Sequence, residues 1–163
     1  MSTRTFLKFD PPIQGGSRDE KHKDELEILS WQHGFTQSVS GSRSADGGTV
    51  GRATHQPIYM TKMADGSMAE LLKRMDGGDA IKGAILSCYR ANGSKEPHLY
   101  LKVEMADVRI AKYDISGGGD SLPVESFALD YGKVNYIYTP LNPDGTPAGN
   151  KPVEMDLEKG TVK

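Results

Sequence analysis

The sequence predicts a mainly β fold, a small β-barrel of two antiparallel sheets with one flanking α-helix and extended loops. From Leu99 to Met105, apolar and polar residues alternate with the period of two of a half-buried strand. A second run, residues 125–138, alternates in the same way, but its apolar phase slips by one residue after Gly132. A glycine at such a slip marks a β-bulge or a barrel corner. Two long bent strands therefore indicate a closed or nearly closed sheet.

Shorter elements follow from local patterns along the chain. Strands are predicted where apolar and β-branched residues run between turn residues, over residues 5–9, 25–32, 35–40, 57–62, 80–90 and 153–157, with a short polar tail after the last. One helix is predicted because Met68, Leu71, Leu72 and Met75 recur at i, i+3, i+4 and i+7. Asp65 or Ser67 caps its start, and Gly77-Gly78 ends it.

Loops are predicted where glycine, proline and small polar residues gather, over residues 15–23, 41–52 and 140–152. Asn92-Gly93 marks a hairpin turn, and the glycines at 117–119 mark a hinge between the two long runs. The segment 41–52 cannot build a core. A structureless loop of this length within a compact domain is usually functional, so we expect it to contact a partner.

Length and charge narrow the class of protein. A chain of 163 residues fits one domain, 1–163, and buries roughly 70% of its unfolded surface without needing disulfides or metal. Its 20 basic and 22 acidic residues are mixed along the chain, so neither nucleic acid nor an anionic membrane is an expected partner. The N-terminal residues hold no apolar core of signal-peptide length, so synthesis in the cytoplasm without a cleaved signal peptide is expected.

Residues able to support catalysis or bind a cofactor or metal are scattered. Cys88 is the only cysteine and lies in an apolar run, so we expect a small buried hydrophobe. The histidines occur singly, without the short spacings of a zinc site, at positions 22, 33, 55 and 98. The glycine-rich segments lack the lysine and Ser/Thr of a phosphate loop, and no nucleophile elbow is present. No catalytic, cofactor-binding or metal-binding residues are therefore predicted, and an assembling structural protein is favoured.

An ordered set of motifs extends along nearly the whole chain. It comprises Phe6-Leu7-Lys8-Phe9, the polar loop 15–23, Leu26-Glu27-Ile28-Leu29-Ser30-Trp31, Pro57-Ile58-Tyr59-Met60-Thr61-Lys62, Tyr89-Arg90-Ala91-Asn92-Gly93, and residues 124–131 with Tyr136-Ile137-Tyr138. Each motif alone is weak, but the set in this order resembles the hemolysin-coregulated protein (Hcp) family, the tube subunit of type VI secretion systems.

The resemblance implies a hexameric ring around a wide channel, and rings that stack into a tube. A contractile sheath expels that tube into the extracellular space or a target cell, and effector proteins can travel in its lumen. The implied partners are other copies of this chain, sheath, spike and baseplate proteins, and effectors. Stacking needs an element that reaches the next ring, and the segment 41–52 is the candidate, through Arg43, Ser44, Asp46, Gly47, Gly48 and Arg52.

One position is carried over individually from the resemblance. The residue after Trp31 is expected to point toward the channel, where the family can place a small hydroxyl residue, but this chain has Gln32. The departure puts any inherited effector preference in doubt. Trp31 itself is expected to be a packed anchor rather than a ligand platform, because a lone tryptophan in a strand normally fills a core or interface.

Three alternatives remain open at this point. A monomeric β-barrel that binds a small ligand would need a lined cavity, for which Tyr100, Tyr136 and Tyr138 are available. An enzyme would use His33 or His55. A phage-like tail-tube protein shares the expected architecture by resemblance, and a sheath or baseplate partner would separate it from a secretion tube.

Overall fold

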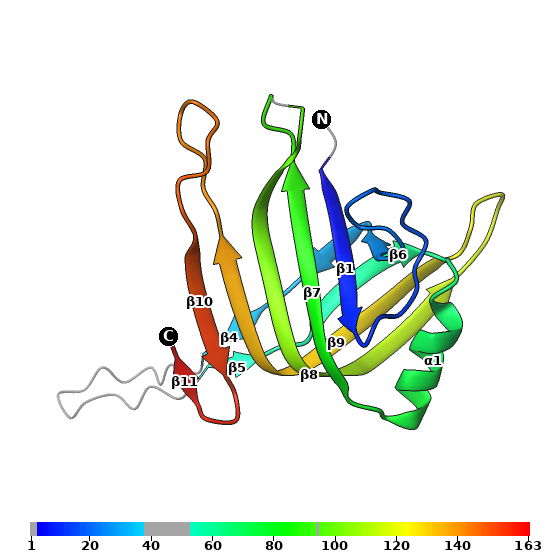
Figure 1. The fold of residues 1–163 in the computed structure, drawn as a ribbon. Coiled ribbons are helices and arrows are strands. Elements are labelled where there is room, and N and C mark those ends of the chain that lie inside the picture. The colour runs from blue at the N-terminus through cyan, green and yellow to red at the C-terminus, as the bar shows by residue number, and fades with distance from the viewer. Residues whose placement is uncertain (1–2, 38–52, 94) are drawn as a thin grey trace.

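The computed structural model describes residues 3–37, 53–93 and 95–163. Eleven strands and one helix follow the order β1 (Arg4–Asp10), β2 (Leu26–Ile28), β3 (Ser30–Gln32), β4 (Phe35–Thr36), β5 (Thr54–His55), β6 (Ile58–Met63), α1 (Met68–Gly77), β7 (Ile81–Arg90), β8 (His98–Ser116), β9 (Val124–Tyr138), β10 (Lys151–Asp156) and β11 (Thr161–Val162). The predicted class is confirmed: the fold is mainly β, with antiparallel pairing and one short helix (Figure 1).

Strand β9 is central to the sheet because two different strands pair along one of its edges. Along its other edge it pairs with β8, from Leu101↔Tyr138 to Ser116↔Val124. The first half of β9 pairs with β6, between Met63↔Val124 and Ile58↔Leu129. Its second half pairs with β10, between Asp156↔Lys133 and Lys151↔Tyr138. The strands β10 and β11 therefore extend from the barrel as a separate wing, at the left of Figure 1.

The two halves of β9 diverge at the corner predicted from Gly132. Asp107 on β8 has a φ of 53°, the left-handed region that non-glycine residues rarely adopt. The Asp107 side chain packs directly against Gly132. A Cβ at position 132 would lie only 3.1 Å from Asp107 Oδ2, so a glycine is needed there for the two residues to lie this close. The flanking pairs Ala106↔Lys133 and Val108↔Tyr131 keep one register through the corner, and the ladder's irregularity falls further along, between Ile110 and Lys112.

Residues 26–32 close the barrel, and here the prediction of one strand over 25–32 is wrong. β2 pairs with β1, whereas β3 pairs with β6, so the two halves bond to different neighbours. Between them, the Leu29 amide donates to Thr61 O at 2.8 Å, and the Leu29 side chain is 59% exposed. The segment thus bridges the two borders of the curved sheet.

Smaller differences occur at both ends of the chain. The strand predicted over 35–40 ends at Thr36 among the described residues, and it pairs with the unpredicted β5. β10 begins at Lys151, two residues before its predicted start, and the predicted polar tail contains β11, which pairs with Met155 and Asp156. The β4–β5 pairing joins segments far apart in sequence, whereas β11 folds back on the adjacent β10, and both β5 and β11 are too short to show an alternating pattern.

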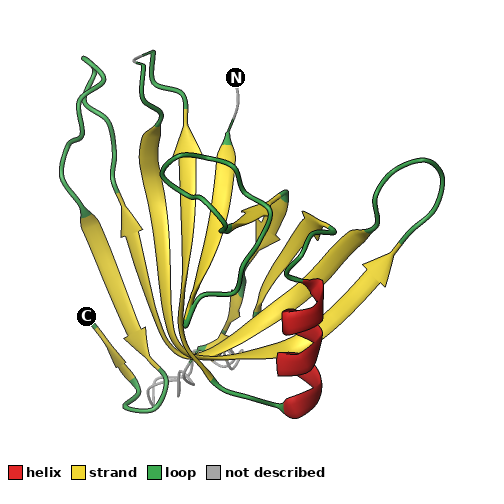
Figure 2. Ribbon diagram, turned by 45° about the vertical axis from the view of Figure 1, so that its right-hand side comes forward, coloured by secondary structure: helices red, strands yellow, loops and turns green. Residues whose placement is uncertain are grey.

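The barrel encloses one cluster of buried hydrophobic side chains contributed by β1, β2, β6–β9 and the helix. Cys88 belongs to this cluster and is fully buried, as expected. Helix α1 stands beside the second half of β8 (Figure 2) and buries Leu71, whereas Leu72 is 42% exposed. Gly78, with a φ of 65°, ends the helix as predicted, because the left-handed conformation there suits glycine.

A buried ion pair joins β6 to β9 beneath the helix. Lys62 and Glu125 are directly paired across the two strands, both are fully buried, and Lys62 Nζ donates to Glu125 Oε2. Lys62 Nζ also donates to Asp65 Oδ1 at 2.9 Å, and the Tyr113 hydroxyl donates to the second oxygen of Glu125. Burial and the bond to Glu125 raise the pKa of Tyr113, which keeps this hydroxyl a donor.

Asp65 connects the ion pair to the start of the helix. Its Oδ1 accepts from the Ser67 amide at 2.9 Å and from the Ser67 hydroxyl, so the carboxylate of Asp65 holds the residue that precedes the helix, and the Ser67 side chain makes no capping bond to the first turn. Its Oδ2 accepts from the Gly16 amide at 3.0 Å. Burial alone would raise the pKa of Asp65, but the bonds from Ser67 and Lys62 lower it overall.

Lys62→Met should lower the free energy of unfolding by about 3–5 kcal/mol, because it leaves the Glu125 carboxylate buried without its cation. The double variant Lys62→Met/Glu125→Gln should recover part of this loss. Denaturant titration measures both. As a control, Lys102→Met removes an exposed pair with Glu104 and should cost less than about 1 kcal/mol. An equally small effect of Lys62→Met would contradict the role given to the buried pair.

Candidate functional site: the sheet face around Gln32

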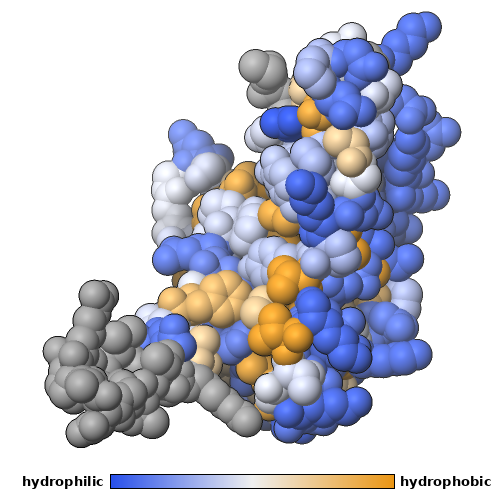
Figure 3. Space-filling view, turned by 90° about the vertical axis from the view of Figure 1, so that its left-hand side faces the viewer, coloured by the Kyte–Doolittle hydropathy of each residue, from blue (hydrophilic) through white to orange (hydrophobic). Residues whose placement is uncertain are grey.

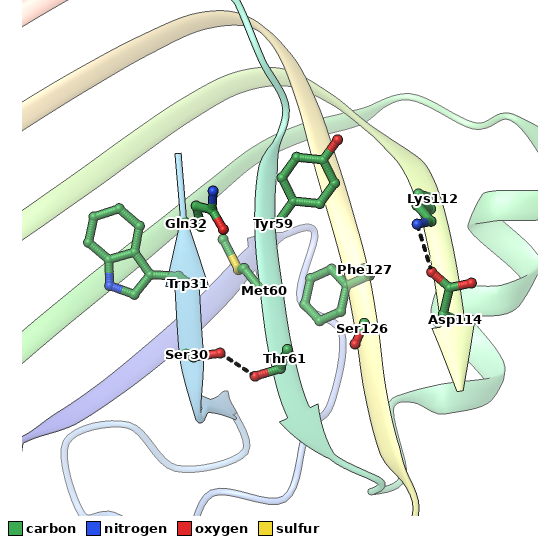
Figure 4. A pocket seen from close by; sticks show the side chains of 10 residues that line it. All are labelled: Ser30, Trp31, Gln32, Tyr59, Met60, Thr61, Lys112, Asp114, Ser126 and Phe127. Atoms are coloured by element: carbon green, nitrogen blue, oxygen red, sulfur yellow. Dashed lines mark hydrogen bonds and ion pairs between the residues drawn. The ribbon is translucent and has the colours of Figure 1, made fainter. Parts of the chain in front are cut away.

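Gln32 lies exposed on the outer face of the barrel wall, at the C-terminal end of β3. The register across β3, β6, β9 and β8 aligns two rows of side chains on this face. One row is Ser30, Thr61, Ser126 and Asp114; the other is Gln32, Tyr59, Ala128 and Lys112. Residues between the rows, such as Met60 and Phe127, belong to the buried core. Figure 4 shows the side chains that line this face, which is hollowed by about 400 Å³.

The face is polar but nearly neutral. Ser30 Oγ and Thr61 Oγ1 lie 2.5 Å apart and share a hydrogen bond. Lys112 and Asp114 form an ion pair with 3.2 Å between Nζ and Oδ2, so they largely neutralise each other. Tyr59 contributes an aromatic ring that is 43% exposed. Hydroxyls, an amide and one aromatic ring can hydrogen-bond and pack against a protein surface, and no histidine among the lining residues could activate the hydroxyls as nucleophiles.

Trp31 is half-buried and packs against the core cluster, as the anchor role predicted. The six residues expected to mediate stacking, Arg43, Ser44, Asp46, Gly47, Gly48 and Arg52, lie outside the described residues, so that role stays a prediction. The structure does define where this segment attaches. Its flanks form the hairpin of β4 and β5, with the pairs Phe35↔His55 and Thr36↔Thr54.

The two histidines considered for catalysis meet in one hydrogen-bonded group with two tyrosines of β9. We call His33, His55, Tyr131 and Tyr136 the His33 cluster. His33 Nε2 lies 3.0 Å from Gln56 O and 2.7 Å from the Tyr131 hydroxyl, and the Tyr136 hydroxyl bonds His33 Nδ1. The Tyr131 hydroxyl also lies 2.9 Å from His55 Nδ1. These partners are tyrosines and a carbonyl, not the carboxylate and nucleophile of a hydrolase.

The electrostatics of the His33 cluster favour neutral side chains. Burial lowers the pKa of His33 to about 4, although its bond to Gln56 opposes this, and burial also lowers the pKa of His55. Burial raises the pKa of Tyr136 to about 12 and raises that of Tyr131 as well. Sequence reasoning named both histidines but missed the group. The phase slip after Gly132, which places Tyr131 and Tyr136 together, was its only signal.

The other residues singled out in the sequence support neither a small-molecule site nor a metal site. Tyr100 and Tyr138 pack edge to face with ring centroids 6.5 Å apart, whereas Tyr136 contacts His33, so the three tyrosines do not line one ligand cavity. Within the described part of the chain, no group of three or more His, Cys, Asp or Glu side chains could hold a metal ion. No helix in that part is long and apolar enough to cross a membrane.

The surface on the side of β10 and β11 carries exposed apolar residues. Val153, Leu157 and Val162 are 37%, 38% and 70% exposed, respectively. Figure 3 shows apolar side chains gathered among hydrophilic ones on this side of the molecule. The sheet also ends here: β11 and the adjoining Lys163 pair with β10 only from Glu154 to Asp156. An incompletely covered edge with apolar neighbours is a surface suited to protein contacts.

Comparison with known structures shows the same fold over the whole chain. A structure described as a type six secretion system protein matches with a TM-score of 0.90 and 24% identity, covering 99% of this chain and 100% of the other. Hcp1 from Salmonella typhimurium matches with a TM-score of 0.80 and 27% identity, covering 100% of both chains. A type VI secretion system effector from Yersinia pestis matches with a TM-score of 0.73 and 23% identity, covering 93% and 98%.

The family comparison rests on the sequence itself. No curated protein sequence gives a significant match. The model of the family described as "Type VI secretion system effector, Hcp" matches residues 6–138, most of the chain. This range includes Gln32, the His33 cluster and the corner at Gly132. The chain belongs to the Hcp family, whose members are structural, non-enzymatic proteins secreted by type VI secretion systems.

Proposed function

We propose that this chain is the tube subunit of a type VI secretion system. Hexameric rings stack into a tube that a sheath expels, and the lumen carries or chaperones effector proteins. The observation that carries the proposal is the match to Hcp1 over the full length of both chains, together with the Hcp family match. The one core cluster further supports a single assembling domain over residues 1–163.

Self-assembly gives the exposed edge of the wing a role. Residues 151–153 of β10 have no strand on their outer side among the described residues, because β11 pairs further along. Pro152 lacks a backbone N–H, which weakens pairing at this edge without preventing it. Head-to-tail contacts that close into a ring shield such edges from uncontrolled aggregation.

In this proposal the face around Gln32 lines the channel, and effectors contact it. Its neutral, hydroxyl-bearing surface supports the proposal because it can hold a protein by several weak bonds and release it again. The segment 41–52 extends from the β4–β5 hairpin to the neighbouring ring, where Arg43, Asp46 and Arg52 supply charged contacts. Sheath, spike and baseplate proteins complete the machine, which exports the chain from the bacterial cytoplasm.

Gln32→Cys tests the channel-facing assignment directly, because the native Cys88 is fully buried and does not compete for thiol reagents. In assembled tubes, a small maleimide should label position 32, whereas a maleimide on a polymer wider than the channel should not. Mass spectrometry quantifies both reactions. Lys82→Cys, at a side chain that is 82% exposed on β7, is the matched control and should react with both reagents. Equal labelling of position 32 by the bulky reagent would contradict the assignment.

Arg43→Glu should shorten or abolish tubes while leaving rings intact, because reversing a charge at the ring-to-ring contact turns an attraction into a repulsion. Electron microscopy measures tube length, and light scattering measures ring mass. Lys82→Glu makes the same charge change on β7, which does not pair with β4 or β5, and should leave tube length unchanged. Tubes of normal length in Arg43→Glu would show that stacking does not depend on this segment.

A further inference from the structure

We propose that the His33 cluster is an acid-sensitive latch, which holds the β4–β5 hairpin against β9 when its histidines are neutral and releases the hairpin when they are protonated. The latch itself is independent of the tube proposal. Only its consequence for stacking rests on the proposed function, because the hairpin flanks the segment assigned to that contact.

The hairpin depends on the cluster for its attachment. β4 and β5 share only two residue pairs, far fewer than a hairpin needs to be stable alone. His33 stacks on Tyr136 with ring centroids 5.7 Å apart and an interplanar angle of 3°. Phe35 packs against His33 and His55, with centroids 4.4 and 4.9 Å away. These ring contacts and the hydrogen bonds of the cluster fix the hairpin to the face of β9.

One arrangement of protons satisfies all of these hydrogen bonds with both histidines neutral. Gln56 O can only accept, so His33 Nε2 carries the ring proton and donates to this carbonyl and to the Tyr131 oxygen. His33 Nδ1 then accepts from the Tyr136 hydroxyl. The Tyr131 proton is left to donate to His55 Nδ1. Every hydrogen in this chain has an acceptor, and a proton on a nitrogen that faces a tyrosine would force that hydroxyl to accept instead of donate.

Protonation of the histidines in acid therefore destabilises the closed hairpin. A proton on His33 Nδ1 would face the Tyr136 O–H, and one on His55 Nδ1 would face the Tyr131 O–H, so each tyrosine would have to turn its hydrogen away. The two positive rings would also repel each other. Buried charge without a counter-ion is costly, and opening the hairpin to water removes that cost.

Among the residues that the structure describes, the surroundings of the two histidines supply little compensating charge. The charged group facing the cluster from β9 is Asp130, whose exposed carboxylate accepts from the Tyr131 backbone amide at 3.0 Å. From β7, the Cys88 thiol contributes electrostatically to the raised pKa of Tyr136. Burial raises the pKa of Cys88 as well, so this thiol stays neutral. From β5 and the segment between β3 and β4, the titratable groups are the two histidines themselves, His55 and His33. Among the described residues, neither histidine has a carboxylate as hydrogen-bond partner.

The pH range follows from the pKa of His33, which is about 4 in the closed hairpin and near 6.5 when the ring is in water. Because the closed form binds fewer protons, its stability is constant above about pH 6.5, falls as the pH drops toward about 4, and levels off below. Partial solvent access moderates the effect. We expect the opening constant to rise by about tenfold between pH 7.5 and pH 5.

Hydrogen exchange of the Gln56 amide reports this opening, because that amide donates to Gly34 O at 3.1 Å across the base of the hairpin. In the assembled protein, its exchange, corrected for the intrinsic pH dependence, should accelerate about tenfold on acidification. His33→Gln keeps hydrogen-bonding atoms but does not titrate, so most of this acceleration should disappear. His98→Gln, at a histidine that donates to Thr139 O outside the cluster, should behave as the native protein does.

Tyr136→Phe provides a second test if His33→Gln fails to fold. It removes the hydroxyl that donates to His33 Nδ1, so the hairpin should open more readily at pH 7.5, and its exchange should accelerate less on acidification because Nδ1 can then take a proton without displacing a donor. Exchange that does not accelerate in acid, or acceleration that persists in His33→Gln, would overturn the latch. If the hairpin opens in acid but tube length by microscopy stays constant, the latch stands and the stacking role of the adjoining segment fails.

Discussion

The corner at Asp107 and Gly132 is the constraint on which the rest of the structure depends. A non-glycine residue in the left-handed region costs roughly 1–2 kcal/mol, and the fold accepts this cost because the bend lets β9 carry two neighbours on one edge. β6 occupies the half of that edge before the corner, and β10 occupies the half after it. Without the bend, either the barrel could not close or the wing would have no strand to join.

The same corner decides which side chains share a face. Tyr131 and Tyr136 are five residues apart, so a regular strand would place them on opposite faces. After the phase slip at Gly132, the even-numbered side chains of β9 lie on the face that the odd-numbered ones occupy before it. Tyr131 and Tyr136 therefore share a face, and both hydroxyls bond to His33. The attachment of the β4–β5 hairpin therefore depends on one backbone distortion, which lies more than twenty residues away in sequence from Phe35 and His55. The same distortion positions the base of the segment assigned to stacking.

Sequence patterns predicted those features that a single segment determines. The long alternating runs gave β8 and β9, the slip at Gly132 gave the corner, and four apolar residues with a glycine end gave α1. The break at Leu29 and the β4–β5 hairpin were not predictable in this way, because each exists only through pairing with a segment distant in sequence, and β11 is too short to show an alternating pattern. Composition alone also would not have identified the family, which emerged from the order of weak motifs.

A tube subunit must assemble with copies of itself, and the mass of the purified protein by light scattering after size exclusion tests this most directly. If six copies form a closed ring, the measurement should detect a species near six times 17.7 kDa. This species should persist on dilution, because in a closed ring of head-to-tail contacts every subunit has both of its interfaces occupied. A species that stays at 17.7 kDa over the whole accessible concentration range would contradict the tube-subunit account.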